Sequence, residues 1–229
     1  MRTVAIVQAR MQSRRLPGKV LMPIAGKPLL AFLVDRIKAA ASLDDLVVAT
    51  GDVSANRPIV ELAQASGLKI FVGSEDDVLD RFVQAARVHR ADVVVRVTAD
   101  NPLTDPGVVD ALVAARAGAG ADLAWSDRLI DGAGSEVTTR EALARASSAA
   151  TSQAHREHVT LIMKEQPARF SVVRWTPPLL LSRPDLSVTV DTLEEFEKVR
   201  ALCEMRGPGT LAPAWPEMIR RLDTRLAQV

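Results

Sequence analysis

Aromatic residues are scarce in this chain of 229 residues: they make up 3% of it, and tyrosine is absent. Charge of one sign is lacking too, because 29 Lys and Arg nearly balance 28 Asp and Glu, for a formal net charge of +1. A general nucleic-acid surface needs a basic stripe or stacking aromatics. We therefore expect no nucleic-acid partner.

Cysteine occurs once, at Cys203, which excludes an intramolecular disulfide and a Cys-based zinc site. Its place in the apolar spacing of a predicted helix favours a buried small hydrophobe over a nucleophile. Long apolar runs are also lacking: Thr3–Val7 is too short for a signal-peptide core, and no stretch approaches the length of a membrane span. The simplest expectation is a cytoplasmic protein without a membrane segment.

What is present is the composition of an ordinary folded protein, with 48% hydrophobic and 25% charged residues. The length suits one globular domain over residues 1–229. The regular pattern loosens after the first half, and residues from about 126 to 186 are predicted to form a subdomain or arm inserted in that domain.

Strand-like and helix-like segments alternate along the chain, which predicts βαβ units. The expected fold is α/β, with a doubly wound, mainly parallel sheet covered by helices on both faces. The predicted strands are Thr3–Val7, Leu46–Thr50, Leu68–Val72, Val93–Thr98, Asp122–Trp125, Ser171–Trp175 and Ser187–Val190. The predicted helices are Leu29–Ala41, Arg57–Ser66, Val78–His89, Pro106–Ala117, Arg140–Ala150, His155–Gln166, Leu193–Met205 and Trp215–Leu226.

A basic loop, Gln8–Lys19, follows the first predicted strand, where ligands bind in open α/β sheets. It carries Arg10, Arg14, Arg15 and Lys19. Guanidinium groups bind phosphate oxygens bidentately, so this loop is able to wrap a polyphosphate. A solvated basic loop is the alternative, and the position after the first strand favours phosphate. Neither a kinase-type phosphate loop nor a dinucleotide fingerprint occurs in the sequence.

Two aspartates follow predicted strands at what should be the same edge of the sheet. Asp100 comes after Val93–Thr98, and Asp191 comes after Ser187–Val190. Mg²⁺ prefers oxygen ligands and commonly takes one or two carboxylates together with substrate phosphates. Taken singly, Asp100 could cap a turn and Asp191 could be a helix N-cap or its neighbour, but the pair favours a metal site.

Other polar groups favour structural interpretations. The acidic run Glu75–Asp77 and Asp80 surrounds a helix start, where acids offset the helix dipole. His155 and His158 lack the helical zinc-protease spacing, so a solvated face or a polar substrate contact is expected there. No serine lies in a Gly-x-Ser-x-Gly elbow, which leaves a hydrolase triad without support.

The motifs together resemble one enzyme family. Gln8-Ala-Arg-Met-x-Ser-x-Arg-Leu-Pro-Gly-Lys19, followed by Gly26-Lys-Pro-Leu-Leu30, closely resembles the opening signature of the sugar-activating cytidylyltransferases. That family includes the CMP-ketodeoxyoctonate synthetases, the acylneuraminate cytidylyltransferases and the spore coat polysaccharide biosynthesis protein F group, whose motifs these most resemble. The segments that also look like this group are Gly73–Phe82, Arg96–Leu103, Arg156–Thr160 and Val188–Thr192.

The resemblance implies a nucleotide-diphospho-sugar transferase-like fold, a Rossmann-like three-layer sandwich, with CTP, Mg²⁺ and often a homodimer. It implies that Arg10, Arg15 and Lys19 grip the triphosphate and that Asp100 and Asp191 hold Mg²⁺. Catalytic roles fall to Arg10, Arg15, Lys19 and Asp100, and Glu136 and His158 face the acceptor. The implied nucleotide-binding set is Gln8, Ala9, Arg10, Ser13, Arg15, Lys19, Asp80 and Arg81. Arg14 departs from the family, which usually has a small residue there.

The resulting hypothesis is a Mg²⁺-dependent cytidylyltransferase that transfers CMP from CTP to an acidic sugar or related small acceptor and releases pyrophosphate. The first alternative is a nucleotide-sugar-dependent glycosyltransferase of the same fold, although the usual Asp-x-Asp pair is replaced here by Asp100-Asn-Pro. The second alternative is a catalytically silent nucleotide-binding protein.

Overall fold

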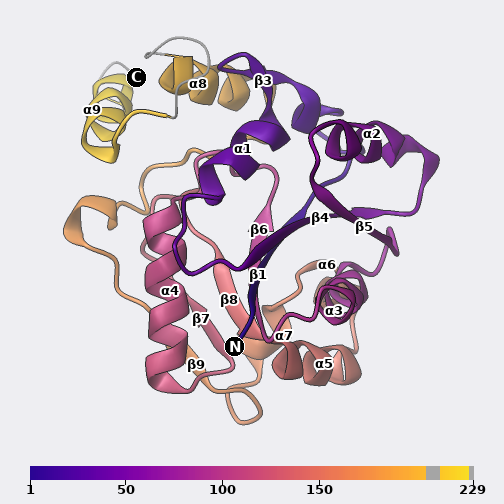
Figure 1. Cartoon of the computed structure of the whole chain (residues 1–229). Coiled ribbons are helices and arrows are strands. Elements are labelled where there is room, and N and C mark those ends of the chain that lie inside the picture. Colours follow the sequence, from indigo (N-terminus) through magenta and orange to yellow (C-terminus); the bar gives the residue numbers. More distant parts are fainter. Residues whose placement is uncertain (205–211, 227–229) are drawn as a thin grey trace.

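The computed structural model describes residues 1–204 and 212–226 and contains a seven-stranded sheet (Figure 1). The strand order is β5-β4-β1-β6-β8-β7-β9. The first four strands in this order pair in parallel, β8 runs antiparallel to both β6 and β7, and β9 is parallel to β7. The expected α/β fold with a mainly parallel sheet is confirmed. The strands span Thr3–Gln8 (β1), Asp45–Gly51 (β4), Lys69–Gly73 (β5), Val93–Thr98 (β6), Leu123–Trp125 (β7), Glu136–Thr139 (β8) and Val172–Arg174 (β9).

Helices pack on both sides of the sheet because successive side chains of a buried strand point to opposite faces. Ala5 and Val7 of β1 lie in one core cluster with apolar residues of α1, α2, α4, α8 and α9. Val4 and Ile6 lie in the other with residues of α3, α5 and α7. The helices span Leu29–Ile37 (α1), Arg57–Ala65 (α2), Val78–Val88 (α3), Pro106–Ala119 (α4), Arg140–Ala149 (α5), Gln153–Glu157 (α6), Leu161–Glu165 (α7), Leu193–Cys203 (α8) and Trp215–Leu226 (α9).

The strand order reverses at β1, which creates the crevice that binds ligands in such sheets. The chain passes from β1 to β4 and β5 on one side and then crosses to β6 on the other. Gln8 at the end of β1 is level with Thr98 at the end of β6, and the Ala99 N–H donates to the Gln8 carbonyl at 2.9 Å. The loops that follow β1 and β6 therefore leave the sheet side by side.

Two predicted elements are wrong. Ser187–Val190 is no strand: Ser187 forms a single bridge to Asp131, while the Val188 and Val190 amides donate to the carbonyls of Asp131 and Asp100, both at 2.8 Å. These bonds go to loops rather than to a neighbouring strand. The predicted helix His155–Gln166 is two short helices, α6 and α7, because His158 has non-helical dihedral angles.

The other predicted helices and strands occur within a few residues of their expected bounds, and Met205 of one predicted helix lies outside the described residues. Strand β8 of the main sheet was not expected. The two small hairpin strands, β2 (Pro23–Ile24) and β3 (Lys27–Pro28), and three 3-10 turns were not expected either: η1 (Lys19–Leu21), η2 (Ser54–Asn56) and η3 (Leu179–Leu181). Within the described residues, no helix is both long and apolar enough to cross a bilayer.

Candidate active site

A polar cleft lies at the point where the strand order reverses. It is formed by the loop after β1, the residues after β6, the start of α3, the end of α6 and the segment before α8. We call it the first cleft. Its lining residues are Gln8, Ala9, Arg10, Ser13, Arg14, Arg15, Lys19, Val20, Val78, Arg81, Thr98, Ala99, Asp100, Glu157 and Asp191.

The basic loop folds back on itself around Met11. The Met11 carbonyl accepts hydrogen bonds from the amides of Ser13 at 3.0 Å and Gly18 at 2.9 Å. Gly18 has a φ of 74°, a left-handed conformation that glycine adopts without the cost of a Cβ. η1 begins at the next residue, Lys19, which is only 6% exposed. This turn carries the Lys19 side chain into the cleft.

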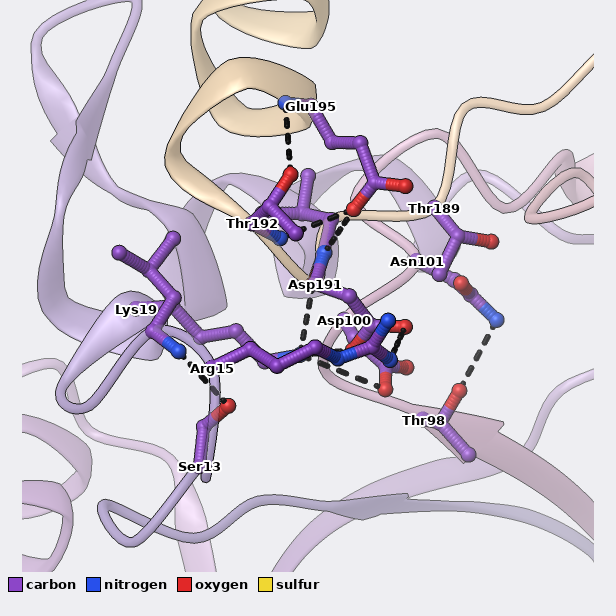
Figure 2. Close-up of polar contacts among 12 residues, drawn as sticks. Ser13, Arg15, Lys19, Thr98, Asp100, Asn101, Thr189, Asp191, Thr192 and Glu195 are labelled. Carbon is purple, nitrogen blue, oxygen red and sulfur yellow. Dashed lines mark hydrogen bonds and ion pairs between the residues drawn. The ribbon is translucent and has the colours of Figure 1, made fainter.

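Lys19 joins the two predicted metal-ligating aspartates (Figure 2). Its Nζ lies 2.9 Å from Asp191 Oδ1 and 3.6 Å from Asp100 Oδ2, and it donates to the Val190 carbonyl at 2.6 Å. Arg15 reaches Asp191 from the other side, with 2.6 Å between Nη2 and Oδ2. The two carboxylates thus converge on one ammonium group, although they are 91 residues apart in the sequence.

Asp191 is held at this place by the start of α8. Thr192 is the helix N-cap and forms a capping box with Glu195. The Glu195 carboxylate accepts from the amides of Asp191 at 2.8 Å and Thr192 at 2.9 Å, as drawn in Figure 2. Asp191 therefore lies one residue before the N-cap. Its own carboxylate takes no part in capping and faces the cleft.

The donor set at Asp100 and Asp191 fits a hard divalent cation. Carboxylate oxygens are the ligands that Mg²⁺ prefers, and such ions commonly use one or two carboxylates plus substrate phosphates. Among the described residues, no group of three or more His, Cys, Asp or Glu side chains could hold a metal by itself. A metal at this pair would therefore complete its shell with water and substrate oxygens.

The end of the first cleft near α3 contains buried groups without partners. Arg81 is 2% exposed, and its Nη1 donates to the Ser74 carbonyl at 2.6 Å. Burial lowers the pKa of Arg81, and the nearby Glu75 carboxylate opposes that shift. Across the residues that the structure covers, Arg81 Nε and Gln8 Oε1 are buried without a hydrogen-bond partner. A bound polar ligand would satisfy both atoms.

Most of the predicted nucleotide-binding residues line the first cleft, but three predicted site residues lie outside it: Asp80, His158 and Glu136. Asp80 lies in the first turn of α3, where its amide donates to the N-cap Asp77 at 2.8 Å and its carboxylate accepts from Gln84 at 3.2 Å. His158 is exposed at the end of α6. The roles of Asp80 toward nucleotide and of His158 toward acceptor stay predictions.

A second cleft adjoins the first and shares Thr98 with it. It lies over the end of β6 and the β7–β8 connection. Its lining residues are Arg96, Thr98, Asn101, Trp125, Ser126, Asp127, Leu129, Ile130, Asp131, Gly132, Gly134, Ser135, Glu136 and Pro184. Glu136, which was predicted to face the acceptor, is on its wall.

Glu136 is bound on several sides by protein groups. Its carboxylate accepts from Arg96 Nη1 at 2.8 Å, from Thr160 Oγ1 at 2.6 Å and from Lys164 Nζ. Burial alone would raise the pKa of Glu136, but the charges of Arg96 and Lys164 and these hydrogen bonds outweigh it and lower the pKa to about 2. Glu136 is thus an ionised anchor between β6, β8 and α7.

The second cleft also has polar atoms that no protein group satisfies. Arg96 Nε, Asn101 Oδ1, Trp125 Nε1 and Ser135 Oγ are buried without a hydrogen-bond partner in the described part of the chain. None of these four residues was predicted to be a site residue. Arg96 and Asn101 fall within the motif Arg96–Leu103, which could have identified them as site residues. Trp125 and Ser135 lie in no such motif.

Fold and clefts together define a nucleotidyltransferase: an α/β sheet with a basic loop and paired carboxylates at the point where the strand order reverses. The model of the cytidylyltransferase family matches residues 4–212, and the chain belongs to that family.

Individual relatives agree with this assignment. Spore coat polysaccharide biosynthesis protein SpsF from Bacillus subtilis (strain 168) is 35% identical over 207 residues, which are 88% of this chain and 86% of that protein. The structure of a cytidylyltransferase from Leptospira borgpetersenii serovar Hardjo-bovis (strain JB197) superposes with a TM-score of 0.90 at 24% identity, over 99% of this chain and 96% of that one. A CMP:2-keto-3-deoxy-manno-octonic acid synthetase complexed with CTP superposes with a TM-score of 0.68 at 22% identity, over 90% and 100%. The last two likenesses concern the fold.

Proposed function

We propose that this cytidylyltransferase transfers CMP from CTP to an acidic sugar or related small acceptor and releases pyrophosphate. The observation that carries the proposal is the first cleft, where Arg10, Arg14, Arg15 and Lys19 surround Asp100 and Asp191. Phosphoryl transfer of this kind depends on positioning and on charge neutralisation more than on covalent help from the protein.

The cations of the first cleft would bind the triphosphate. Lys19 and Arg15 are paired with Asp191, and Arg10 lies 3.1 Å from Glu157. Phosphate oxygens would replace these carboxylates as the partners of the cations, since charge-assisted bonds to Arg and Lys are strong and Arg binds phosphate bidentately. Arg10, Arg15 and Lys19 would then stabilise the negative charge that develops on the departing pyrophosphate.

Asp100 and Asp191 would hold Mg²⁺, which would supply Lewis-acid polarisation of phosphate oxygens when bound. The role of the protein in that arrangement is to hold the two carboxylates in position. The Val190 amide, bonded to the Asp100 carbonyl at 2.8 Å, and the capping box at Thr192 hold the two aspartates in register.

The unpartnered atoms near α3 support a pyrimidine in the first cleft. A cytosine offers an exocyclic amino donor together with ring nitrogen and carbonyl acceptors. Gln8 Oε1 would accept from the amino group, and Arg81 Nε would donate to a ring acceptor. Both protein groups are buried, so a base that leaves them unpaired binds less well.

The second cleft would receive the acceptor, because it opens beside Asp100 and presents unpartnered donors and acceptors. Among the described residues the one cation on its wall is Arg96, which is already paired with Glu136, and Asp127 and Asp131 add negative charge. Hydroxyl groups suit this lining better than a carboxylate does. The acid group of the acceptor would therefore point toward the arginines of the first cleft.

The remaining parts of the proposal concern assembly and location. We propose a homodimer in the cytoplasm, with residues 126–186 serving acceptor binding or dimerisation. In this chain these residues supply β8 and β9 of the main sheet together with most of the second cleft. The cleft residues on this segment give the acceptor role its support.

The test is a thermal-shift series with CTP, UTP, ATP and GTP, each with and without Mg²⁺, followed by pyrophosphate release with candidate acceptors. A ligand that binds only the native state raises its stability by mass action. We expect a shift selective for CTP and larger with Mg²⁺. A shift with a UDP-sugar and none with any nucleoside triphosphate would instead indicate the glycosyltransferase, and CTP binding without turnover on any acceptor would indicate a silent binding protein.

A further inference from the structure

One side chain outside the basic loop holds the loop backbone, and it belongs to none of the residues assigned above. Asn56, at the start of α2, is 1% exposed. Its Oδ1 accepts from the Met11 amide at 2.8 Å. Within the described residues this is the single hydrogen bond from such a side chain to the backbone of residues 10–17.

Met11 is the residue around which the loop folds. Its carbonyl binds the Ser13 and Gly18 amides, so its position fixes the stretch that carries Arg14 and Arg15 and the turn that buries Lys19. An anchor at the Met11 amide therefore acts on all these cations together, although it touches none of them.

Asn56 is itself oriented by the end of β4 and by the segment between β5 and α3. Its Nδ2 donates to Glu75 Oε2 at 2.7 Å and to the Gly51 carbonyl at 3.2 Å. Glu75 lies directly over Gly51: a Cβ at Gly51 would come within 1.6 Å of Glu75 Oε2. Glu75 also adjoins Ser74, whose carbonyl anchors Arg81, and its charge acts on Arg81. The chain Glu75, Asn56, Met11 thus connects the Arg81 side of the cleft to the basic loop.

We propose that Glu75 and Asn56 are positioning residues that hold the basic loop in its phosphate-binding conformation and thereby set the affinity for CTP. The inference rests on the proposed function for the identity of the ligand. A side-chain amide serves this role because it accepts from the Met11 amide and donates to Glu75 at the same time.

The first experiment is calorimetric titration of the full chain with CTP in the presence of Mg²⁺. Asn56→Ala should raise the CTP Kd about tenfold, since the Met11 amide loses its hydrogen-bond acceptor and the loop loses its anchor. Glu75→Ala should shift Kd in the same direction, whereas Glu75→Gln keeps an acceptor for Asn56 Nδ2 and should restore nearly the wild-type value. The double variant should be no weaker than Asn56→Ala alone, because both act through one chain of bonds.

The matched control is Thr139→Ala, which removes the N-cap bond of α5, from the Ala142 amide at 3.0 Å, far from the loop. It should lower the melting temperature as a lost helix cap does and leave the CTP Kd unchanged. If Asn56→Ala does not fold, the pair Glu75→Ala and Glu75→Gln carries the same test. Wild-type Kd values in folded Asn56→Ala and Glu75→Ala would overturn the inference.

A second measurement separates this inference from the proposed function. Amide hydrogen exchange at Met11 and Gly18 in the free protein should accelerate in Asn56→Ala and Glu75→Ala but not in Glu75→Gln or Thr139→Ala. Failure of the wild type to bind CTP would count against the proposed function and leave this readout intact. Unchanged exchange at Met11 in Asn56→Ala would overturn the positioning role whatever the ligand is.

Discussion

The two clefts hold their charges in different ways. In the first cleft the arginine ion pairs are open to water, although Lys19 is buried: the Arg15 side chain is 63% exposed where it meets Asp191, and that of Arg10 is 47% exposed beside Glu157. In the second cleft the side chains of Arg96 and Glu136 are 17% and 14% exposed. Lys164 also pairs with Glu136, and its Nζ lies 3.8 Å from the centroid of the Trp125 ring. Exposed pairs contribute little to stability, whereas removing one partner of a buried pair is costly.

This difference indicates a division of work. Charges that exchange partners easily suit a site that must accept and release a highly charged triphosphate. Charged groups held in buried ion pairs suit a site that recognises a neutral, hydroxyl-bearing group by shape and hydrogen bonds. Removing a charge from the first cleft should therefore affect activity more than stability, and removing one from the second cleft should do the reverse.

The largest effect is expected for Asp100→Ala. We expect kcat/KM for pyrophosphate release to fall about a thousandfold or more, because charge stabilisation at the reacting phosphate depends on this carboxylate. The melting temperature should stay close to the wild-type value. The matched control is Asp35→Asn, which removes an exposed, ion-paired carboxylate on α1, outside both clefts, and should leave turnover unchanged. Near-normal activity in Asp100→Ala would remove the metal assignment.

In the second cleft, Glu136→Ala should lower stability more than activity. Loss of this carboxylate leaves Arg96 and Lys164 without their shared partner, and we expect the free energy of unfolding to fall by about 3 kcal/mol. Urea unfolding at neutral pH measures it. Glu61→Ala, at an exposed pair with Arg57, is the control and should cost little. Equal losses in both variants would contradict the contrast between buried and open pairs.

The same carboxylate has a pH signature. The pKa of Glu136 is lowered from 4.5 to about 2, so its ionised form contributes stability above pH 4.5, and that contribution is lost as the pH falls toward 2. The difference in unfolding free energy between the wild type and Glu136→Gln should therefore narrow through that range. A constant difference would show that the charge is not what Glu136 contributes.

The sequence predicted the first cleft better than the second because their signals differ in kind. The continuous apolar runs at Thr3–Val7 and Val93–Thr98 identified buried parallel strands, and parallel strands bring Gln8 and Asp100 to one edge. β8 is short, polar and antiparallel, and its residues Glu136–Thr139 carry no run or alternation that marks a strand. Without β8, neither Glu136 nor Ser135 could be placed beside Arg96.

The segment before α8 shows how a local pattern misleads. Ser187–Val190 alternates as a half-buried strand does, yet its amides bond to the Asp131 and Asp100 carbonyls, partners that only the folded chain provides. The position of Asp191 was nonetheless predictable, because the capping signal Thr192 to Glu195 is local and fixes where the helix begins. Asn56, a single polar residue before α2, had no local signal because the two partners that it connects, Met11 and Glu75, are distant in sequence.

The smallest effect is expected for Arg14→Ser, in the first cleft. Arg14 is exposed and lines the cleft, and in the part of the chain that the structure describes it has no ion pair, unlike Arg10, Arg15 and Lys19. Among the described residues its removal breaks no ion pair or side-chain hydrogen bond, so the melting temperature should not change. An exposed charge near the triphosphate should contribute modestly, and we expect the CTP Kd to rise about threefold at low ionic strength, with the effect fading as salt is added.

Arg169→Ser, an exposed arginine after α7 and outside both clefts, is the matched control for the change in net charge and should leave Kd unaltered. Steady-state kinetics then decide which substrate Arg14 serves. If Arg14→Ser raises KM for the acceptor and leaves KM for CTP unchanged, Arg14 is the cation that meets the acceptor's acid group. That outcome would place recognition of the acid group in the loop after β1, at a position where the resemblance to the family predicts a small residue.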